Sequence, residues 1–241
     1  MRKSYELNTS FSQVIDTSLS TNGYTLGMQM TRPVQTSVRV RQAGTENDIV
    51  EVAEMWNRSA AWLRRRGLDQ WQYPVKWENI RRTATNGTLW LVTTNDDRAI
   101  GTITVESRAD PYWLPSDDPE DALYIHRMVV DDGARGSELG SALLDWAAGR
   151  ARQAGKSWLR LDAWKSNPAL HQYYLNRGFS LVRIDDNPAN PSGACFQRPA
   201  SVELHAGPDV VENNSAGSDR ISSKSGVAER HELVYRYDST T

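Results

Sequence analysis

The apolar positions of the chain first follow a period of two and then a period close to that of a helix. Val38 and Val40 alternate with arginines, which predicts a half-buried strand. Thr45 then precedes a run in which apolar residues recur at helical spacing as far as Leu63. Gly67 ends that run. We therefore expect a strand followed by a long amphipathic helix.

The same two periodicities continue to residue 198. Apolar runs on either side of an Asn-Asp-Asp turn predict a β-hairpin, and three prolines indicate a loop before the next strand. The expected elements are a short helix at 76–84, a hairpin within 88–107, a loop at 108–122, strands at 123–130 and 157–165 with a helix between them, a short helix from Asn167, and strands at 180–184 and 193–198. This order predicts an α/β fold, in which a mixed, mostly antiparallel twisted sheet is flanked by helices and includes one βαβ unit.

The two ends of the chain differ from its middle in composition. Residues 1–36 are rich in Ser, Thr and Asn, and residues 201–241 are rich in Ser, Asn, Gly, Asp and Glu. Segments with so few apolar residues bury too little surface to offset the entropy of ordering. We expect a poorly ordered extension at 1–36, a folded domain at 37–200 and a largely disordered tail at 201–241, where the segment ELVYRY could add an isolated strand.

Composition and charge exclude several classes of partner. The net charge of −2 gives no reason to expect nucleic acid or a membrane surface. No apolar run approaches the roughly 18 residues of a membrane span, and the N-terminus lacks a signal sequence. A lone cysteine, Cys195, rules out an intramolecular disulfide and fits a reducing compartment. The histidines and Cys195 show no metal-ligand spacing. We expect a cytoplasmic protein without a metal.

Residues 129–147, VVDDGARGSELGSALLDWA, pass from a strand through a glycine-bearing turn into a helix. This arrangement presents backbone N–H groups to a phosphate. It is not a P-loop, because Gly136 and Gly140 are only four positions apart and no lysine follows them. It is not a dinucleotide fingerprint either. A simple helix-capping turn remains the alternative.

Two segments of the βαβ unit together resemble the GCN5-related N-acetyltransferases. The turn RGSELG is similar to the family pattern Q/R-x-x-G-x-G/A at Arg135 and Gly140, with Glu138 where the family usually has glycine. Further along the chain, NPALHQYYLNRGF is similar to a second signature, which matches at Asn167, Tyr174, Gly178 and Phe179. The order of the elements over residues 38–200 also fits the family.

The resemblance implies an acyl-CoA N-acyltransferase-like fold and acetyl-CoA as co-substrate. In the family, the turn binds the pyrophosphate through backbone N–H groups, and the preceding strand end pairs with the pantetheine arm. The residues implied to bind acetyl-CoA are Met128, Val129, Val130, Arg135, Gly136, Ser137, Glu138, Leu139, Gly140, Ser141 and Asn167. Met128 and Val130 can be core residues at the same time, because only their backbone is needed.

Glu138 is the physical difficulty in this interpretation. A carboxylate a few ångströms from a pyrophosphate costs roughly several kcal/mol at an effective dielectric near 20. We therefore expect Glu138 to project outward and Arg135 to offset part of its charge.

Tyr174 is the catalytic candidate. The resemblance implies that it is the general acid that protonates the departing CoA thiolate. A phenol with a pKa of about 10 can donate to a thiolate whose conjugate acid has a pKa of about 8.5. The alternative is a tyrosine that only packs beside Tyr173. Asn167 is expected to cap its helix, and the resemblance adds a contact with CoA.

A base is also needed, because only a free amine attacks a thioester. His126 lies two residues before Met128, so strand alternation places both on one face. A neutral imidazole there could accept the proton, although a purely structural histidine is the alternative. Tyr124 is the next candidate on that face.

The acceptor site is less well marked. The loop 108–122 carries five acidic residues and one arginine, so it could attract a cationic amine or simply be a solvated loop. We expect Trp71 and Asp69, which follow the first long helix, to bind the acceptor.

These features favour an enzyme that transfers the acetyl group of acetyl-CoA directly to a primary amine of a small molecule or peptide. A non-catalytic acyl-CoA-binding sensor or scaffold is the alternative, and an interaction domain without a cofactor is a third. A homodimer is compatible with the sequence.

Overall fold

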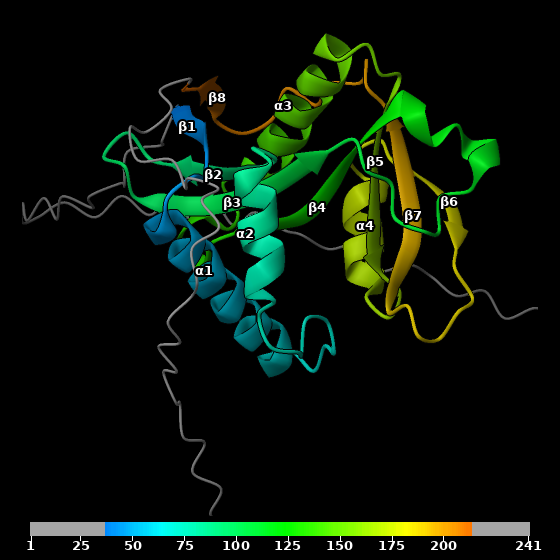
Figure 1. The fold of residues 1–241 in the computed structure, drawn as a ribbon, viewed down its shortest axis with the longest axis horizontal. Helices are drawn as coiled ribbons and strands as arrows, with labels where there is room; N and C mark the ends of the chain where they lie inside the picture. Colours follow the sequence, from blue (N-terminus) through cyan, green and yellow to red (C-terminus); the bar gives the residue numbers. More distant parts are fainter. Residues whose placement is uncertain (1–36, 214–241) are drawn as a thin grey trace, which may run out of the picture. The chain divides into compact units, whose positions relative to one another are not determined.

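The computed structural model describes residues 37–213, all within one unit of the chain, built on a single eight-stranded sheet (Figure 1). The strands lie in the order β6-β7-β5-β4-β3-β2-β1-β8. The elements are β1 (Ser37–Gln42), α1 (Glu46–Arg65), α2 (Trp77–Thr85), β2 (Leu89–Thr93), β3 (Ala99–Glu106), β4 (Ala122–Val130), α3 (Leu139–Gln153), β5 (Trp158–Trp164), α4 (Pro168–Leu175), β6 (Ser180–Ile184), β7 (Ser192–Pro199) and β8 (Asp209–Glu212). Three 3-10 turns, η1 (Pro115–Asp117), η2 (Pro119–Asp121) and η3 (Asp132–Ala134), lie on either side of β4.

The expected fold class is confirmed. β1 to β4 pair in antiparallel fashion, β4 and β5 are parallel with α3 between them, and β5, β7 and β6 are again antiparallel. The helix α1 begins where the sequence predicts, because Thr45 and Asp48 form a reciprocal capping box.

Helices cover both faces of the sheet. α1 and α2 lie in front of it in Figure 1, and their apolar residues form one core cluster with β2. α3 contributes Leu139, Leu143 and Leu144 to a second cluster, which also contains Tyr174 of α4. Each face therefore has its own hydrophobic core, and the sheet between them holds the strands whose ends form the site.

Strand β4 is interrupted by a β-bulge. Thr104 of β3 pairs with His126, but Thr102 pairs with Val129, so β4 has one residue more than its partner. Arg127 takes up the extra length in a left-handed conformation, with φ of 47°. The pairing between β4 and β5 stops at Ile125. Figure 1 shows the result: β3 runs across the view, whereas β5 and β7 run from top to bottom.

The bulge also shifts the alternation of β4 by one residue. Before it, Ile125 belongs to the core on the α3 face; after it, Met128 packs there and Val129 lies on the α1–α2 face. The expectation that alternation alone places His126 and Met128 on one face is therefore wrong. The bulge instead brings these two residues and Arg127 to the same cavity.

The sheet extends beyond the domain boundary expected at residue 200. β8 adds a parallel strand to β1, and Glu212 accepts hydrogen bonds from Arg150 of α3 at 2.9 Å. The sequence did not predict β8, because its four residues form too short an alternating pattern to be told from a polar tail. The expected N-terminal extension and the segment ELVYRY lie outside the described residues. Among residues 37–213, no helix is long and apolar enough to cross a membrane.

Candidate functional site

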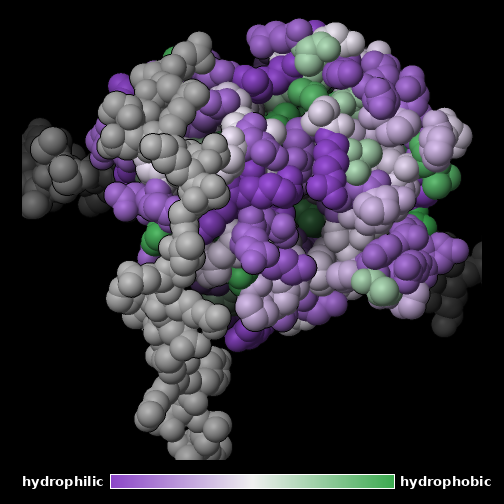
Figure 2. Space-filling view, in the orientation of Figure 1, coloured by the Kyte–Doolittle hydropathy of each residue, from purple (hydrophilic) through white to green (hydrophobic). Residues whose placement is uncertain are grey.

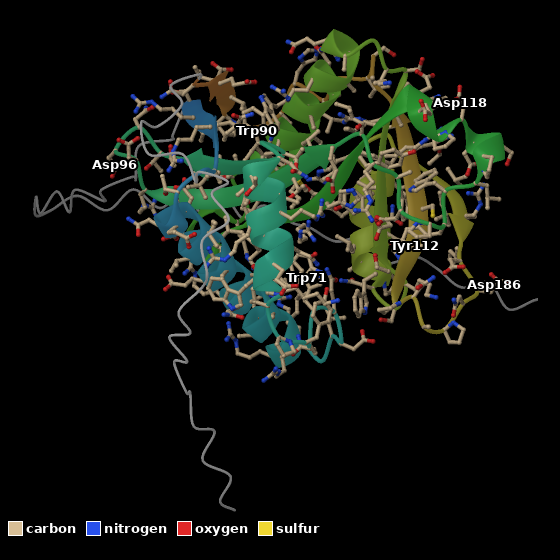
Figure 3. All side chains as sticks on the ribbon, in the orientation of Figure 1. Trp71, Trp90, Asp96, Tyr112, Asp118 and Asp186 are labelled. Atoms are coloured by element: carbon tan, nitrogen blue, oxygen red, sulfur yellow. The ribbon has the colours of Figure 1, made fainter. Side chains whose placement is uncertain are left out.

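A cavity of about 370 Å³ opens where β4 and β5 separate. Both strands line it, together with α4, the loop between α1 and α2, and the loop before β4. Trp71 and Tyr112, labelled in Figure 3, come to it from segments far apart in the sequence. Figure 2 shows a hollow on this face, with apolar residues deep inside a mostly hydrophilic surface. The cavity is thus built by the tertiary fold rather than by one motif.

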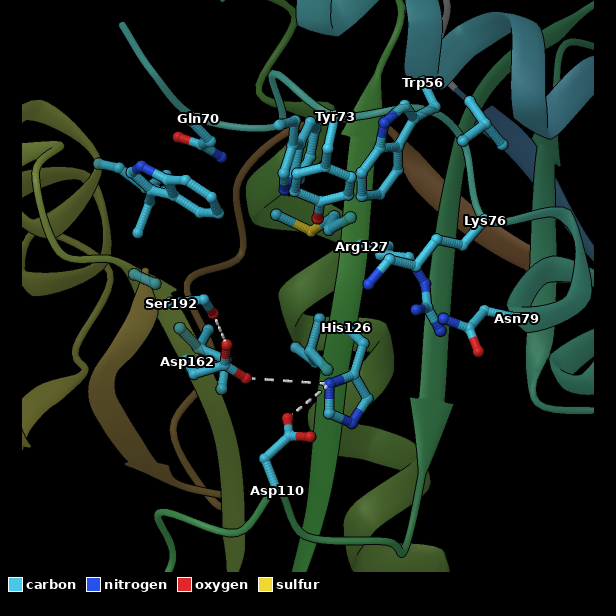
Figure 4. Close-up of a pocket in the computed structure, with 18 of the residues that line it drawn as sticks. Trp56, Gln70, Tyr73, Lys76, Asn79, Asp110, His126, Arg127, Asp162 and Ser192 are labelled. Carbon is cyan, nitrogen blue, oxygen red and sulfur yellow. Dashed lines mark hydrogen bonds and ion pairs between the residues drawn. The ribbon is translucent and has the colours of Figure 1, made fainter. Parts of the chain in front are cut away.

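Two carboxyl groups and an imidazole meet on one wall of the cavity (Figure 4). His126 Nδ1 lies 3.3 Å from Asp110 Oδ2 and 3.9 Å from Asp162 Oδ1. Asp162 also accepts a hydrogen bond from Ser192. Each residue comes from a different segment: the loop before β4, the bulge of β4, and the middle of β5.

Burial changes the protonation of this cluster. The pKa of Asp110 is raised to about 7, because the side chain is desolvated and lies beside the charge of Asp162, to which it is also hydrogen-bonded. Desolvation lowers the pKa of His126, so its imidazole is neutral. His126 Nε2 is buried without a hydrogen bond, 3.6 Å from Glu106 Oε1. The cluster can therefore exchange a proton near neutral pH.

Tyr174 lines the same cavity from α4, as the sequence predicts. It is buried against Phe179 and Phe196 and contacts Tyr173 edge-on. Burial raises the pKa of its phenol, so the hydroxyl stays protonated and can donate a proton.

Aromatic side chains form the opposite wall. Trp71 stacks on Trp56 with ring centroids 4.3 Å apart, and Tyr73 lies 6.0 Å from Trp56 and 6.4 Å from Trp164. Trp71 therefore lines the cavity, and its role in binding the acceptor stays a prediction. Asp69 does not line the cavity. Its carboxylate accepts hydrogen bonds from Trp164 Nε1 at 2.9 Å and from Ser166 Oγ at 2.6 Å. It fixes the aromatic wall from outside.

Asn167 is committed to the protein interior. Its side-chain oxygen caps α4 by accepting from the Leu170 N–H, and its amide donates to Gln70 at 2.7 Å. Only 5% of the residue is exposed. The capping role is confirmed, and the second bond ties α4 to the loop that carries Trp71. These bonds favour a structural role over the expected contact with CoA.

The glycine turn leads into α3 with unpaired backbone donors. Gly136 has φ of 80° and Glu138 has φ of 57°, which turns the chain sharply into the helix. The Ala142 N–H donates to the Glu138 carbonyl, so the N–H groups of the three preceding residues have no acceptor within the helix. Those residues are Leu139, Gly140 and Ser141. This is a suitable site for an anion.

Glu138 does not simply project outward. Its carboxylate accepts hydrogen bonds from Ser141 Oγ at 2.7 Å and from Arg177 at 2.9 Å, although half of the side chain is exposed. These partners lower its pKa. Arg177 also stacks on the ring of Tyr173 at 3.7 Å. The charge of Glu138 is therefore compensated by Arg177, which follows α4.

Arg135 does not have the compensating role expected of it. Its guanidinium lies over the ring of Trp62 at 3.8 Å and pairs with Asp132 at 2.9 Å. Gly140 makes a close contact that a side chain would prevent. A Cβ at this position would come within 2.2 Å of the Tyr173 hydroxyl. Among the other turn residues, Ser137 Oγ donates to the Ala134 carbonyl at 2.6 Å.

Several site residues were missed by sequence reasoning. Asp162 and Arg127 were not singled out, although an acidic residue between buried apolar residues of a strand is a signal in itself. Of the acidic loop, only Asp110 lines the cavity; Asp117 pairs with Arg183. Tyr124, the second base candidate, does not line the cavity, because its hydroxyl donates to the Pro119 carbonyl.

Comparisons with known proteins agree with this geometry. The family model described as "Acetyltransferase (GNAT) family" matches residues 51–179. The chain is 27% identical over 143 residues to YesJ of Bacillus subtilis (strain 168), an uncharacterised N-acetyltransferase; the match covers 57% of this chain and 79% of YesJ.

Solved structures show the same fold. An acetyltransferase of the GNAT family from Listeria monocytogenes 4b F2365 has a TM-score of 0.55 at 22% identity, and the match covers 66% of this chain and 93% of that one. The PaiA N-acetyltransferase from Thermoplasma acidophilum in complex with coenzyme A has a TM-score of 0.53 at 14% identity, covering 67% and 98%. The aminoglycoside acetyltransferase AAC(6')-Ib in complex with coenzyme A and kanamycin has a TM-score of 0.51 at 18% identity, covering 67% and 94%.

Proposed function

The chain belongs to the acetyltransferase (GNAT) family, and from this premise we propose that the cavity between β4 and β5 is where it acetylates a primary amine. The protein is an N-acetyltransferase with acetyl-CoA as co-substrate. The single observation that carries the proposal is the meeting of Tyr174, His126 and Asp110 around one cavity, which β4 lines shortly before the glycine turn begins. An acid and a proton acceptor then face the same space.

The residues between 128 and 141 fit acetyl-CoA. The free N–H groups at the start of α3 suit its pyrophosphate, and the salt bridge to Arg177 removes the objection raised by Glu138. Within the described residues, β4 beyond Ile125 pairs only with β3, so its other edge is open to the amides of the pantetheine arm. We assign Met128, Val129 and Val130 to that contact. Acetyl-CoA supplies the activated acetyl thioester.

The amine must lose a proton before it can react. We assign this step to the cluster of Asp110, His126 and Asp162, whose charge also attracts an ammonium ion. The ionised Asp110 carboxylate, beside the neutral imidazole, accepts the proton. The amine nitrogen then forms a C–N bond with the thioester carbonyl carbon, while backbone N–H groups of the open β4 edge stabilise the oxyanion.

Departure of the thiol completes the reaction. As the C–S bond breaks, the Tyr174 hydroxyl gives its proton to the CoA sulfur. The attacking nitrogen, which is cationic after the C–N bond forms, loses its second proton, and that proton restores the tyrosine. The products are the amide and the free thiol, and the first proton remains on the cluster. The buried setting of Tyr174 keeps the phenol protonated until the C–S bond breaks. Trp56, Trp71 and Tyr73 exclude water from the reacting atoms.

The sensor alternative is disfavoured. Two features of the sequence favour it: Glu138 in the turn and the lack of a glutamate base in the central strand. Arg177 neutralises Glu138, and Asp110 and Asp162 supply carboxylates from elsewhere in the chain.

The test is steady-state thiol release from acetyl-CoA with a panel of amines, measured from pH 5.5 to 9. We expect turnover with at least one primary amine, and kcat/KM rising as the pH passes about 7, because the carboxyl of Asp110 must be ionised. Binding of acetyl-CoA without turnover of any amine would contradict the proposal. EDTA-treated enzyme serves as a control: a rate that depends on added Zn²⁺ or Mg²⁺ would identify the cluster as a metal site instead.

Two further expectations stay predictions, a cytoplasmic location and a homodimer. Sedimentation analysis of the full chain tests the second.

A further inference from the structure

Arg127 and Lys76 are the two basic residues of the cavity, and the proposed mechanism uses neither; Arg127 is the one carried by β4. Among residues 37–213, no hydrogen bond or ion pair is found for its guanidinium. Its side chain is only partly exposed, and desolvation lowers its pKa. A guanidinium that lines a cavity and has no protein acceptor can pair with a negatively charged group of a ligand.

The bulge of β4 is what brings Arg127 to the cavity. In a regular strand, Arg127 would face away from both His126 and Met128. Here all three line the same cavity, because Arg127 adopts a positive φ. This conformation costs a non-glycine residue roughly 1 kcal/mol or more, and such strain persists mainly at functional sites.

A second cavity of about 210 Å³ adjoins the first on the side of Arg127. The two share Asn79, Asp110, His126 and Arg127. Figure 4 shows Lys76, Asn79 and Arg127 on one side of His126 and Asp162 on the other. The site therefore has an acidic part beside a basic part.

The basic part has an excess of positive charge. The second cavity is lined by three arginines and two acidic residues. Arg82 lies 3.6 Å from Glu106, and both Glu106 and Asp110 also act on Arg127, so the three guanidinium groups share two carboxylates. Asp110 is itself adjacent to Asp162 and His126. An anionic group is thus favoured next to Arg127.

We infer that the amine acceptor is a free amino acid or a close analogue, whose carboxylate binds Arg127 while its ammonium group faces Asp110 and Asp162. The inference rests on the proposed function, since it names the acceptor of the same site. The aromatic wall of Trp56, Trp71 and Tyr73 then contacts the rest of the molecule, which favours an apolar or aromatic side chain.

The experiment compares three compounds that share one ring and one amine: L-phenylalanine, its neutral amide and phenethylamine. The corresponding tryptophan series forms a second set. We expect kcat/KM for the amino acid to exceed that for the amide and the amine by about 10- to 100-fold, the range for a charged hydrogen-bonded pair. The amide controls for amine basicity. Its amine is the easiest of the three to deprotonate, so basicity alone would make the amide, and not the amino acid, the best substrate.

Arg127→Gln should remove this preference, lowering kcat/KM for the amino acid about 10- to 100-fold and for the amide less than about threefold. Arg39→Gln, at an exposed arginine on β1, is the matched control and should change neither. If Arg127→Gln does not fold, the wild-type ratio of acid to amide decides alone.

The outcomes separate the two proposals. Equal turnover of acids, amides and amines, or an equal loss for all acceptors in Arg127→Gln, would overturn the amino-acid inference and leave the acetyltransferase intact. No turnover of any amine, with acetyl-CoA still bound, would overturn both.

Discussion

The glycine turn and the cavity proposed to bind the acceptor both lie toward the C-terminal end of β4, yet the chain encodes them in different ways. We propose that the turn binds a phosphate through consecutive backbone N–H groups, which do not depend on the side chain at position 138, where Arg177 pairs with the carboxylate. The cavity depends on side chains from strands, helices and loops that are distant in sequence. The first can be altered by one residue without losing its chemistry, whereas the second depends on the identity of each residue.

The largest effect should come from a change in the cavity that leaves the turn untouched. Tyr174→Phe removes the general acid, so we expect kcat to fall about 10²- to 10³-fold while the Kd of acetyl-CoA changes less than about twofold. Steady-state kinetics and calorimetry measure the two quantities. Tyr173→Phe is the matched control and should keep kcat within about threefold. Equal losses in both variants would show that packing, and not proton donation, matters here.

The proton acceptor sharpens the comparison. Asp110→Asn should lower kcat/KM about 10- to 100-fold at pH 8 and much less at pH 6, because at pH 6 most of the wild-type carboxyl is already protonated. The wild-type rise in kcat/KM near pH 7 should vanish in the variant. Asp118→Asn, at an exposed position of the same loop, should keep the wild-type profile. A rise that persists in Asp110→Asn would move the role to His126.

The turn can be tested by charge balance. Arg177→Gln leaves the Glu138 carboxylate uncompensated near the pyrophosphate, so we expect the Kd of acetyl-CoA to rise about 10-fold at low salt. The double variant with Glu138→Gln should return to within about threefold of the wild type. Calorimetric titration of the four proteins completes a double-mutant cycle. Weak binding that persists in the double variant would assign Arg177 a direct contact with the ligand.

The smallest expected effect is on stability. The folded state raises the pKa of Asp110, so it binds that proton more tightly than the unfolded chain does. The ionised group therefore destabilises the fold progressively as the pH rises from about 4 to about 7. Asp110→Asn should unfold about 2–4 °C above the wild type at pH 8, corresponding to about 1 kcal/mol after allowance for partial exposure, and the difference should shrink at pH 5. Thermal unfolding measures it, and an unchanged difference would contradict the shifted pKa.

Sequence reasoning predicted the parts of the molecule that local patterns encode. The order of the elements followed from periodicity and caps. Tyr174 was implied by the family resemblance and His126 by its position on the strand; both line the cavity, and their catalytic roles stay predictions. Asp162 could not be assigned there, because nothing local shows that β5 separates from β4 beside it. The ion pair of Arg177 could not be predicted for the same reason, because its partner, Glu138, lies at the start of a different helix. β8 was missed because a four-residue strand gains its stability only from β1.

The bulge at Arg127 has a consequence for the balance between folding and activity. Leu123 and Ile125 pack on the α3 face before it, and Met128 and Val130 pack there after it. A chain that lacked Arg127 would therefore alternate without interruption along the whole of β4, with every apolar residue still on its proper side. Such a strand would pair more regularly and carry no positive φ. The protein keeps a less regular sheet than its own sequence could form, and the residue that interrupts the alternation is one that lines the cavity.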